Sequence, residues 1–179
     1  MAKATQEAPS KWGGRMIPPK YHGIALGGFM GSGKSTVGQR LAQKMDVRFV
    51  DMDEELTRLF GSISQQFTRD GEDVFRSRER EWIASFRPEA VVVLATGGGV
   101  WCSQACRGLL QKHYFCVSLS VSWKTASERI QPDHKRPLWT PGAKSLYEQR
   151  KVGYQWGDLR IDTESRSPDD VVQEILRCL

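Results

Sequence analysis

The sequence predicts an α/β fold: a five-stranded parallel sheet with helices on both faces, plus a mobile lid. Short apolar segments alternate with helix-like segments along most of the chain. The first apolar segment leads directly into residues 28–35, which fit G-x-x-x-x-G-K-[ST] without a mismatch. A proline-bounded stretch at 131–142 interrupts the alternation and is long enough to be a lid. The 179 residues suffice for one domain with a sizeable core.

Capping and turn residues mark where the expected helices begin and end. The spacing of Val37 and Leu41 favours an amphipathic helix after the glycine-rich stretch. Gly61 ends the next predicted helix, Ser62 is a suitable N-cap for another, and Pro88 closes a long charged one. The expected order is strand 21–26, helix 34–44, strand 47–50, helices 53–60, 62–70 and 72–87, strand 91–94, helix 103–111, strand 114–119, helices 122–130 and 143–156, strand 159–162 and helix 168–177.

Composition limits the class of protein. The net charge is +5 and the pI is near 9.1, but there is no basic run beyond short pairs. The charge therefore indicates a mildly basic surface, and we expect no nucleic-acid partner. No run of 18 apolar residues is present, so we expect no membrane partner either. The four cysteines form no C-x-x-C pair, which favours a reducing, intracellular setting.

The chain divides into a leader and one domain. Residues 1–20 are polar and rich in proline and glycine, so we expect a flexible leader there. It fits a tail, an expression remnant or the stub of a processed transit peptide. Residues 21–179 are expected to form a single domain. We expect a cytoplasmic monomer, with a plastid location as the alternative if residues 1–20 are the remnant of a transit peptide.

The glycine-rich stretch has the chemistry of a loop that binds the phosphates of a nucleoside triphosphate. Its backbone N–H groups and those of the following helix converge on phosphate oxygens. Lys34 supplies a positive charge for the β- and γ-phosphates, and the Ser35 hydroxyl is offered to Mg²⁺. The residues predicted to bind the nucleotide here are Gly31, Ser32, Gly33, Lys34, Ser35 and Thr36.

Two carboxylates, Asp51 and Asp53, follow the second predicted strand. The carboxyl ends of parallel strands are where open α/β sheets bind ligands. One carboxylate could approach Mg²⁺ through water, and the other could accept a proton from an attacking hydroxyl. Acidic residues also suit a helix N-terminus, so that structural alternative stays open.

Glycines and arginines complete the candidate site. Gly97-Gly98-Gly99 follows the continuous apolar run 91–94, and three glycines let a ligand approach the backbone closely. A tight turn alone would need one glycine. Arg76, Arg136 and Arg150 suit forked recognition of carboxylate and phosphate groups, although each alone is typical of a solvated surface.

Taken together, these motifs resemble those of the shikimate kinases over essentially all of residues 21–179. This family belongs to the P-loop small-metabolite kinases of the nucleoside monophosphate kinase-like class. The matching segments are G-x-x-G-S-G-K-S-T at 28–36, F-x-D-x-D at 49–53, D-G-E at 70–72 with F-R at 75–76, T-G-G-G at 96–99, R-P-L at 136–138 and the arginine at 150.

The resemblance implies transfer of the γ-phosphoryl group of ATP to the 3-hydroxyl of shikimate, with Mg²⁺ as cofactor. It implies a P-loop kinase domain over 21–179, with substrate-binding helices at about 53–87 and the lid at about 131–142. By position, Asp53 grips the shikimate hydroxyls and accepts the proton, and Arg76 and Arg150 bind the carboxylate. The glycines Gly97, Gly98 and Gly99 line that pocket.

For the nucleotide side, the resemblance implies that Ser35 and Asp51 serve Mg²⁺. Arg136 closes with the lid onto the phosphates and acts, with Lys34 and Asp53, as a catalytic residue. Arg129 and Arg166 lie near ATP, the latter beside the adenine.

The chain departs from the family pattern after Arg150. The family usually continues with Pro-Leu-Tyr, whereas this chain has Lys151-Val152-Gly153-Tyr154. Two alternatives stay open. One is another small-metabolite kinase, such as a gluconate kinase, and the other is a nucleotide-binding module of this type without shikimate activity.

Overall fold

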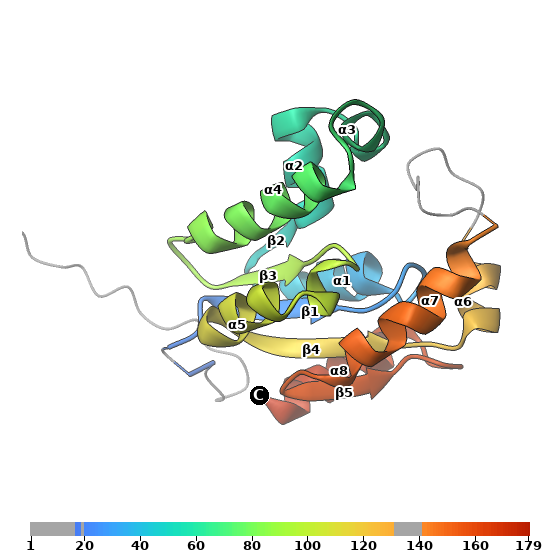
Figure 1. The fold of residues 1–179 in the computed structure, drawn as a ribbon. Helices are drawn as coiled ribbons and strands as arrows, with labels where there is room; N and C mark the ends of the chain where they lie inside the picture. Colours follow the sequence, from blue (N-terminus) through green and yellow to red (C-terminus); the bar gives the residue numbers. More distant parts are fainter. Residues whose placement is uncertain (1–16, 19, 131–140) are drawn as a thin grey trace, which may run out of the picture.

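A computed structural model describes residues 17–18, 20–130 and 141–179 (Figure 1). Five parallel strands form one sheet in the order β2-β3-β1-β4-β5. The predicted five-stranded parallel sheet is therefore confirmed. The strands are β1 Gly23–Gly27, β2 Arg48–Asp51, β3 Val92–Ala95, β4 Tyr114–Ser120 and β5 Leu159–Asp162.

Helices cover both faces of the sheet, as predicted. Ile24 and Leu26 of β1 pack with α1 and α8 on one face, while Ala25 between them packs with the residues of the other face. This alternation is the period-2 pattern of a strand buried on both sides. The helices are α1 Lys34–Met45, α2 Met52–Phe60, α3 Ile63–Asp70, α4 Glu72–Ser85, η1 Val100–Cys102, α5 Gln104–His113, α6 Trp123–Arg129, α7 Ala143–Lys151, η2 Val152–Gln155 and α8 Pro168–Cys178.

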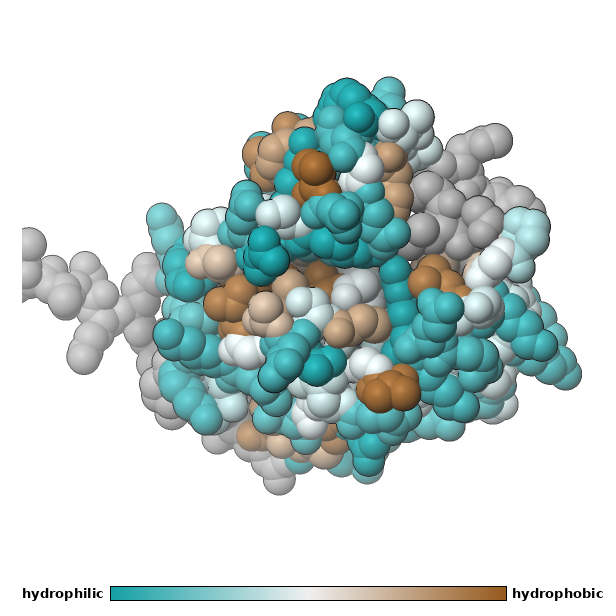
Figure 2. Space-filling model, in the orientation of Figure 1, coloured by the Kyte–Doolittle hydropathy of each residue, from teal (hydrophilic) through white to brown (hydrophobic). Residues whose placement is uncertain are grey.

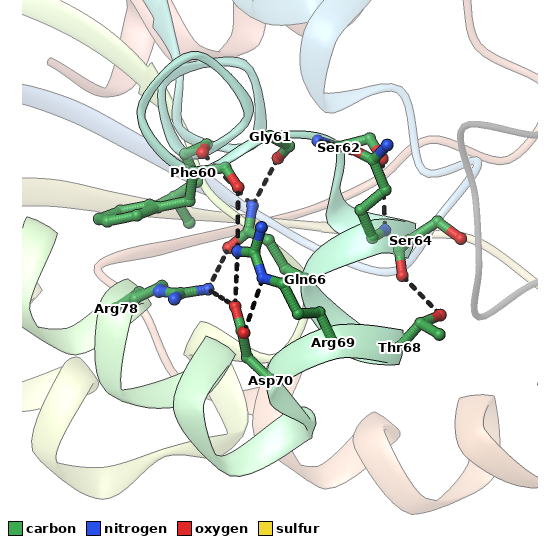
Figure 3. Close-up of polar contacts among 11 residues, drawn as sticks. Phe60, Gly61, Ser62, Ser64, Gln66, Thr68, Arg69, Asp70 and Arg78 are labelled. Atoms are coloured by element: carbon green, nitrogen blue, oxygen red, sulfur yellow. Dashed lines mark hydrogen bonds and ion pairs between the residues drawn. The ribbon is translucent and has the colours of Figure 1, made fainter.

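Helices α2, α3 and α4 form an arm that stands above β2 and β3 in Figure 1. Buried Gln66 of α3 ties the arm together, because its amide donates to the carbonyl oxygen of Gly61 at 2.8 Å (Figure 3). Arg78 of α4 donates to the Gln66 side-chain oxygen at 3.1 Å and to Asp70 at 2.8 Å. These contacts fix α4, and with it Arg76, relative to the rest of the arm.

The surface in Figure 2 is mostly hydrophilic, with separate apolar patches. Among the described residues, the large apolar side chains that are exposed are Leu59, Phe60, Val74 and Val152. Three of these four belong to the arm. No helix in the described ranges is long and apolar enough to cross a membrane.

The helix predicted at 143–156 is the main difference from the sequence prediction. It ends at Lys151, and residues 152–155 continue as the 3-10 helix η2. The tighter turn brings η2 onto η1, the short helix that follows the three glycines. Of the predicted lid, residues 131–140 lie outside the described residues and Arg136 with them. The same holds for the leader except residues 17, 18 and 20.

Candidate active site

The strand order places the sequence motifs at one edge of the sheet. Because β3 lies between β1 and β2, the loops that follow these three strands are neighbours. Leu26 of β1 and Asp51 of β2 both pair with Ala95 of β3, in register. The glycine-rich loop, the acidic segment and the T-G-G-G turn therefore leave the sheet side by side, where parallel sheets bind ligands.

The glycine-rich loop joins β1 to the N-terminus of α1. Gly33 is the N-cap of α1 in the left-handed conformation, with φ of 95°, which favours glycine. No side chain caps this helix, so its first N–H groups remain available to a phosphate. The Lys34 ammonium donates to the carbonyl oxygens of Gly28 at 2.8 Å and Phe29 at 3.0 Å. It therefore lies across the loop, close to where phosphates would sit.

The two residues predicted to serve a metal lie together. The Ser35 hydroxyl donates to Asp51 Oδ2 at 3.0 Å, which joins the start of α1 to the end of β2. Asp51 Oδ1 accepts from the backbone N–H of Asp53 at 3.0 Å and caps α2. The structural alternative for Asp51 therefore holds as well. Within the described ranges, no three Asp, Glu, His or Cys side chains gather as a metal site. One hydroxyl and one carboxylate nevertheless fit Mg²⁺, which keeps several waters and takes further oxygens from phosphates.

Asp53 faces the turn that follows β3. A methyl group placed on Gly97 would lie 3.0 Å from Asp53 Oδ1 and 2.5 Å from Glu79 Oε1. Burial first, and then the negative charges of Asp51 and Glu79, raise the pKa of Asp53 to about 6. Lys34 and Arg76 oppose this rise. A carboxylate with such a pKa is suited to receive a proton near neutral pH.

Arg76 comes from α4 and lies against Gly99, whose Cα faces the guanidinium closely. Its side chain is ion-paired with Glu79 at 2.6 Å and with Glu72 at 2.8 Å. Glu79 is only 2% exposed, and its Oε1 has no hydrogen-bond partner among the described residues. Burial therefore raises the pKa of Glu79, although Arg76 works against this. The ion pair orients the Arg76 guanidinium toward the triglycine turn.

Arg150 reaches the same turn from the last turn of α7. A methyl group on Gly98 would lie 3.5 Å from Arg150 Nη1 and 3.1 Å from the Tyr154 hydroxyl. Arg150 is 8% exposed, yet it forms no ion pair with a described carboxylate. Its charge acts on the buried Glu79 carboxylate without a direct ion pair, so the guanidinium can take an anionic ligand at this point.

Arg129 and Arg166 lie on the other side of the glycine-rich loop. Arg129 donates to the Thr163 carbonyl oxygen at 2.8 Å and to the Gly31 carbonyl oxygen at 3.4 Å. Arg166 is ion-paired with Glu174 at 2.5 Å. Both arginines line a hollow of about 220 Å³ that also includes Ser32, Gly33, Thr36, Val37, Thr163, Pro168 and Val171. Five of the residues predicted to bind the nucleotide therefore line one space beside α1: Ser32, Gly33, Thr36, Arg129 and Arg166.

The sequence motifs did not identify Glu79 or Tyr154 as residues of the site. The Tyr154 hydroxyl donates to the Gly98 carbonyl oxygen at 3.0 Å, which fixes η2 to the triglycine turn. Glu79 had one local signal, its three-residue spacing from Arg76 on a charged helix. Tyr154 had none, because its partner lies 56 residues away along the chain.

A complete phosphate-binding loop lies beside a cluster of two arginines and a carboxylate at the edge of a parallel sheet, and this arrangement defines a P-loop kinase acting on a small molecule. Comparisons with known proteins narrow this class. The family model described as shikimate kinase matches residues 30–179, and the chain belongs to the shikimate kinase family. The family expected from the motifs is confirmed.

Individual relatives agree with this assignment. The chain is 40% identical over 157 residues to a shikimate kinase from Persephonella marina, covering 86% of this chain and 96% of that protein. The solved structure of shikimate kinase from Acinetobacter baumannii in complex with shikimate is similar with a TM-score of 0.80 and 32% identity, covering 87% of this chain and 90% of that one. Shikimate kinase from Aquifex aeolicus gives a TM-score of 0.75 and 34% identity, covering 87% and 94%.

Proposed function

We propose that this protein transfers the γ-phosphoryl group of ATP to the 3-hydroxyl of shikimate, giving shikimate 3-phosphate. The observation that carries the proposal is that Arg76 and Arg150, from two helices, both lie against the triglycine turn. Asp53 lies against the same turn, and Lys34 crosses the neighbouring loop. A carboxylated polyol fits between two guanidinium groups and a basic carboxylate.

On the acceptor side, Arg76 and Arg150 bind the carboxylate of shikimate. Gly97, Gly98 and Gly99 carry no side chains, which lets Asp53, Arg76 and Arg150 approach the turn against which the ring would bind. Asp53 accepts hydrogen bonds from the hydroxyls and takes the proton of the attacking one, for which its pKa of about 6 is suitable. Holding both reactants in place supplies much of the catalysis in phosphoryl transfer.

On the nucleotide side, Gly31, Ser32, Gly33 and Thr36 hold the phosphates through the loop and the start of α1. Lys34 neutralises charge that builds on the transferred group, and Arg136, which lies outside the described residues, joins it from the lid. Ser35, and Asp51 through water, would hold Mg²⁺, which supplies charge neutralisation at the phosphate oxygens. Arg129 and Arg166 border the nucleotide. Monomeric state and cytoplasmic location stay predictions.

A coupled assay of ADP release tests the proposal, with shikimate, gluconate or no acceptor present. We expect release that depends on shikimate and exceeds the rates with gluconate and with no acceptor. ADP release that ignores shikimate would overturn the proposal. A gluconate-dependent rate would assign the site to another acid acceptor, and nucleotide binding without turnover would indicate a binding module.

A further inference from the structure

Helix α7 alone gives the Arg150 side chain little support. It lies in the last turn of a helix that ends one residue later, at Lys151. The α-helix gives way there to the 3-10 helix η2, and an arginine side chain loses much rotamer freedom when it is fixed. A guanidinium that must meet a carboxylate in one geometry therefore needs support from outside its own helix.

Two stacked indoles lie next to this helix end. The rings of Trp101 in η1 and Trp156 after η2 stack with centroids 4.3 Å apart and an interplanar angle of 24°. The Trp156 indole N–H donates to the Trp101 carbonyl oxygen at 3.0 Å. Trp101 is fully buried, and its own indole N–H donates to the Thr96 hydroxyl at 2.7 Å. Trp156 is thus joined to the strand end that carries the three glycines.

Gly153 allows η2 to approach η1 closely. A methyl group at this position would lie 2.8 Å from Cys102 Sγ and 3.0 Å from the Trp101 carbonyl oxygen. The thiol of Cys102 is itself 4.0 Å from the Arg150 carbonyl oxygen. A side chain at residue 153 would therefore push the segment that follows Arg150 away from η1.

Tyr154 of η2 forms hydrogen bonds with both the triglycine turn and β4. Its hydroxyl donates to the Gly98 carbonyl oxygen at 3.0 Å, and its own carbonyl oxygen accepts from the Ser118 hydroxyl of β4 at 2.7 Å. Burial raises the pKa of Tyr154 well above its usual value, so the hydroxyl stays protonated and keeps donating. The residue is held at both ends, directly beside Arg150.

We propose that Trp101, Gly153, Tyr154 and Trp156 form a clamp that positions the Arg150 guanidinium against Gly98 and so sets the preference for a carboxylated acceptor. The clamp residues are positioning residues that act through Arg150. Of these residues, Gly153 lies in the stretch after Arg150 where this chain departs from the family pattern. The inference rests on the proposed function, since it takes Arg150 to bind the shikimate carboxylate.

The test uses Gly153→Ala and Trp156→Ala in the full chain, with shikimate and its neutral methyl ester as acceptors. We expect KM for shikimate to rise about ten- to a hundredfold, the range expected when a binding group is displaced by about 1 Å. KM for ATP and KM for the methyl ester should stay unchanged. Trp156→Phe, which keeps a stacked ring, should restore most of the affinity for shikimate. Val152→Ala is the control, because Val152 lies in η2 but is 78% exposed.

Tyr154→Phe is a milder variant, which tests the clamp even if the other variants fail to fold. It keeps the aromatic ring and removes one hydrogen bond. It should raise KM for shikimate roughly two- to tenfold, as for a single neutral hydrogen bond. If shikimate, the methyl ester and ATP all lose affinity to the same extent in these variants, the residues only support the fold and the clamp is refuted. Unchanged affinity for shikimate in all of them refutes it too.

Arg150→Ala separates the two proposals. If this variant keeps the wild-type KM for shikimate, the role given to Arg150 under the proposed function fails, and the clamp fails with it. If Arg150→Ala weakens shikimate binding and the clamp variants do not, only the clamp fails. In the Arg150→Ala background, Trp156→Ala should add no further loss, because the clamp acts through the missing guanidinium.

Discussion

Asp53 and Glu79 lie against the same glycine, Gly97, although they come from two different helices of the arm. Their carboxylate oxygens would be 3.0 and 2.5 Å from a methyl group at that glycine. Each carboxylate raises the electrostatic cost of ionising its neighbour, and Arg76 offsets this cost at Glu79 with an ion pair. Asp53 has no such ion pair among the described residues, and its pKa is raised to about 6.

Replacing Asp53 by asparagine should remove the proton acceptor and keep the shape. We expect kcat to fall by about 10²–10⁴-fold, the range for loss of a general base. Affinity for ATP should stay nearly unchanged, because the glycine-rich loop is untouched. Glu54→Gln is the matched control on the same helix, since Glu54 is exposed. An unchanged rate in Asp53→Asn would remove Asp53 from this role.

The rate should follow the ionisation of Asp53. With its pKa raised to about 6, the accepting form predominates above pH 6 and is lost below it. The kcat/KM for shikimate should therefore be constant at neutral pH and fall about tenfold per pH unit below about pH 6. A pH–rate profile of the wild-type protein checks this. A profile that stays flat down to pH 4 would assign the proton to another acceptor.

The same ionisation should lower the stability of the fold at neutral pH. The pKa of Asp53 is about 6 in the folded protein against an ordinary value of 3.8, so the folded state binds the proton more tightly. The stabilisation from protonated Asp53 is complete below pH 3.8 and is lost as pH rises through about 6. Asp53→Asn should thus raise the free energy of unfolding by about 1–3 kcal/mol at pH 7.5.

Urea unfolding at two pH values measures this effect. The gain from Asp53→Asn should be present at pH 7.5 and nearly absent at pH 3, below both pKa values, where the wild-type carboxyl group is mostly protonated in both states. Equal gains at both pH values would mean that the substitution acts through packing and not through charge.

Local motifs predicted the parts of the site that each element carries alone. The glycine-rich loop follows from its spacing, and the position of Asp51 follows from the end of a strand. Because the strands are parallel, their carboxyl ends lie at one edge of the sheet, and this does not depend on the side chains in the rest of the chain. The hydrophobic pattern and the glycines therefore sufficed for the fold, and for placing Asp51 beside Ser35.

Contacts between distant segments could not be predicted in this way. The helix at 143–156 looked continuous in sequence, but it tightens at Val152 because Gly153 packs on Trp101 and Cys102. Glu79 reads as one more charge on a solvated helix, and only its burial next to Gly97 gives it a role. Such features depend on which segments meet, and no local periodicity encodes that.

Arg76 and Arg150 should respond differently to removal. Arg76→Ala should weaken shikimate binding by about 2–5 kcal/mol and should also destabilise the fold, because it leaves the buried Glu79 carboxylate unpaired. Arg150→Ala should weaken binding by a similar amount with less loss of stability, since Glu79 keeps its direct ion pair with Arg76 and loses only the more distant charge of Arg150. Shikimate titrations combined with thermal unfolding measure both quantities.

Arg80→Ala is the matched control for Arg76→Ala. It lies on the same helix, is exposed, and donates only to the Ser77 hydroxyl within the described residues, at 3.1 Å. It should change neither binding nor unfolding. An Arg76→Ala variant with wild-type affinity for shikimate would contradict the pairing of Arg76 with the substrate carboxylate.

Gly97 should tolerate no side chain, because its Cα hydrogens point between the two carboxylates. Gly97→Ala would place a methyl group 2.5 Å from Glu79 Oε1, and Glu79 is held by Arg76 and has little room to move. Either the turn or Asp53 must then shift, and a displacement near 1 Å can lower kcat/KM for shikimate about a hundredfold. Nucleotide affinity should be kept, because Gly97 lies outside the glycine-rich loop.

Gly108→Ala is the control for Gly97→Ala. No atom lies within 4 Å of the new methyl group, and alanine in the middle of α5 should stabilise the protein by about 1 kcal/mol. Full activity in Gly97→Ala would show that the carboxylates do not meet across this glycine in the working enzyme.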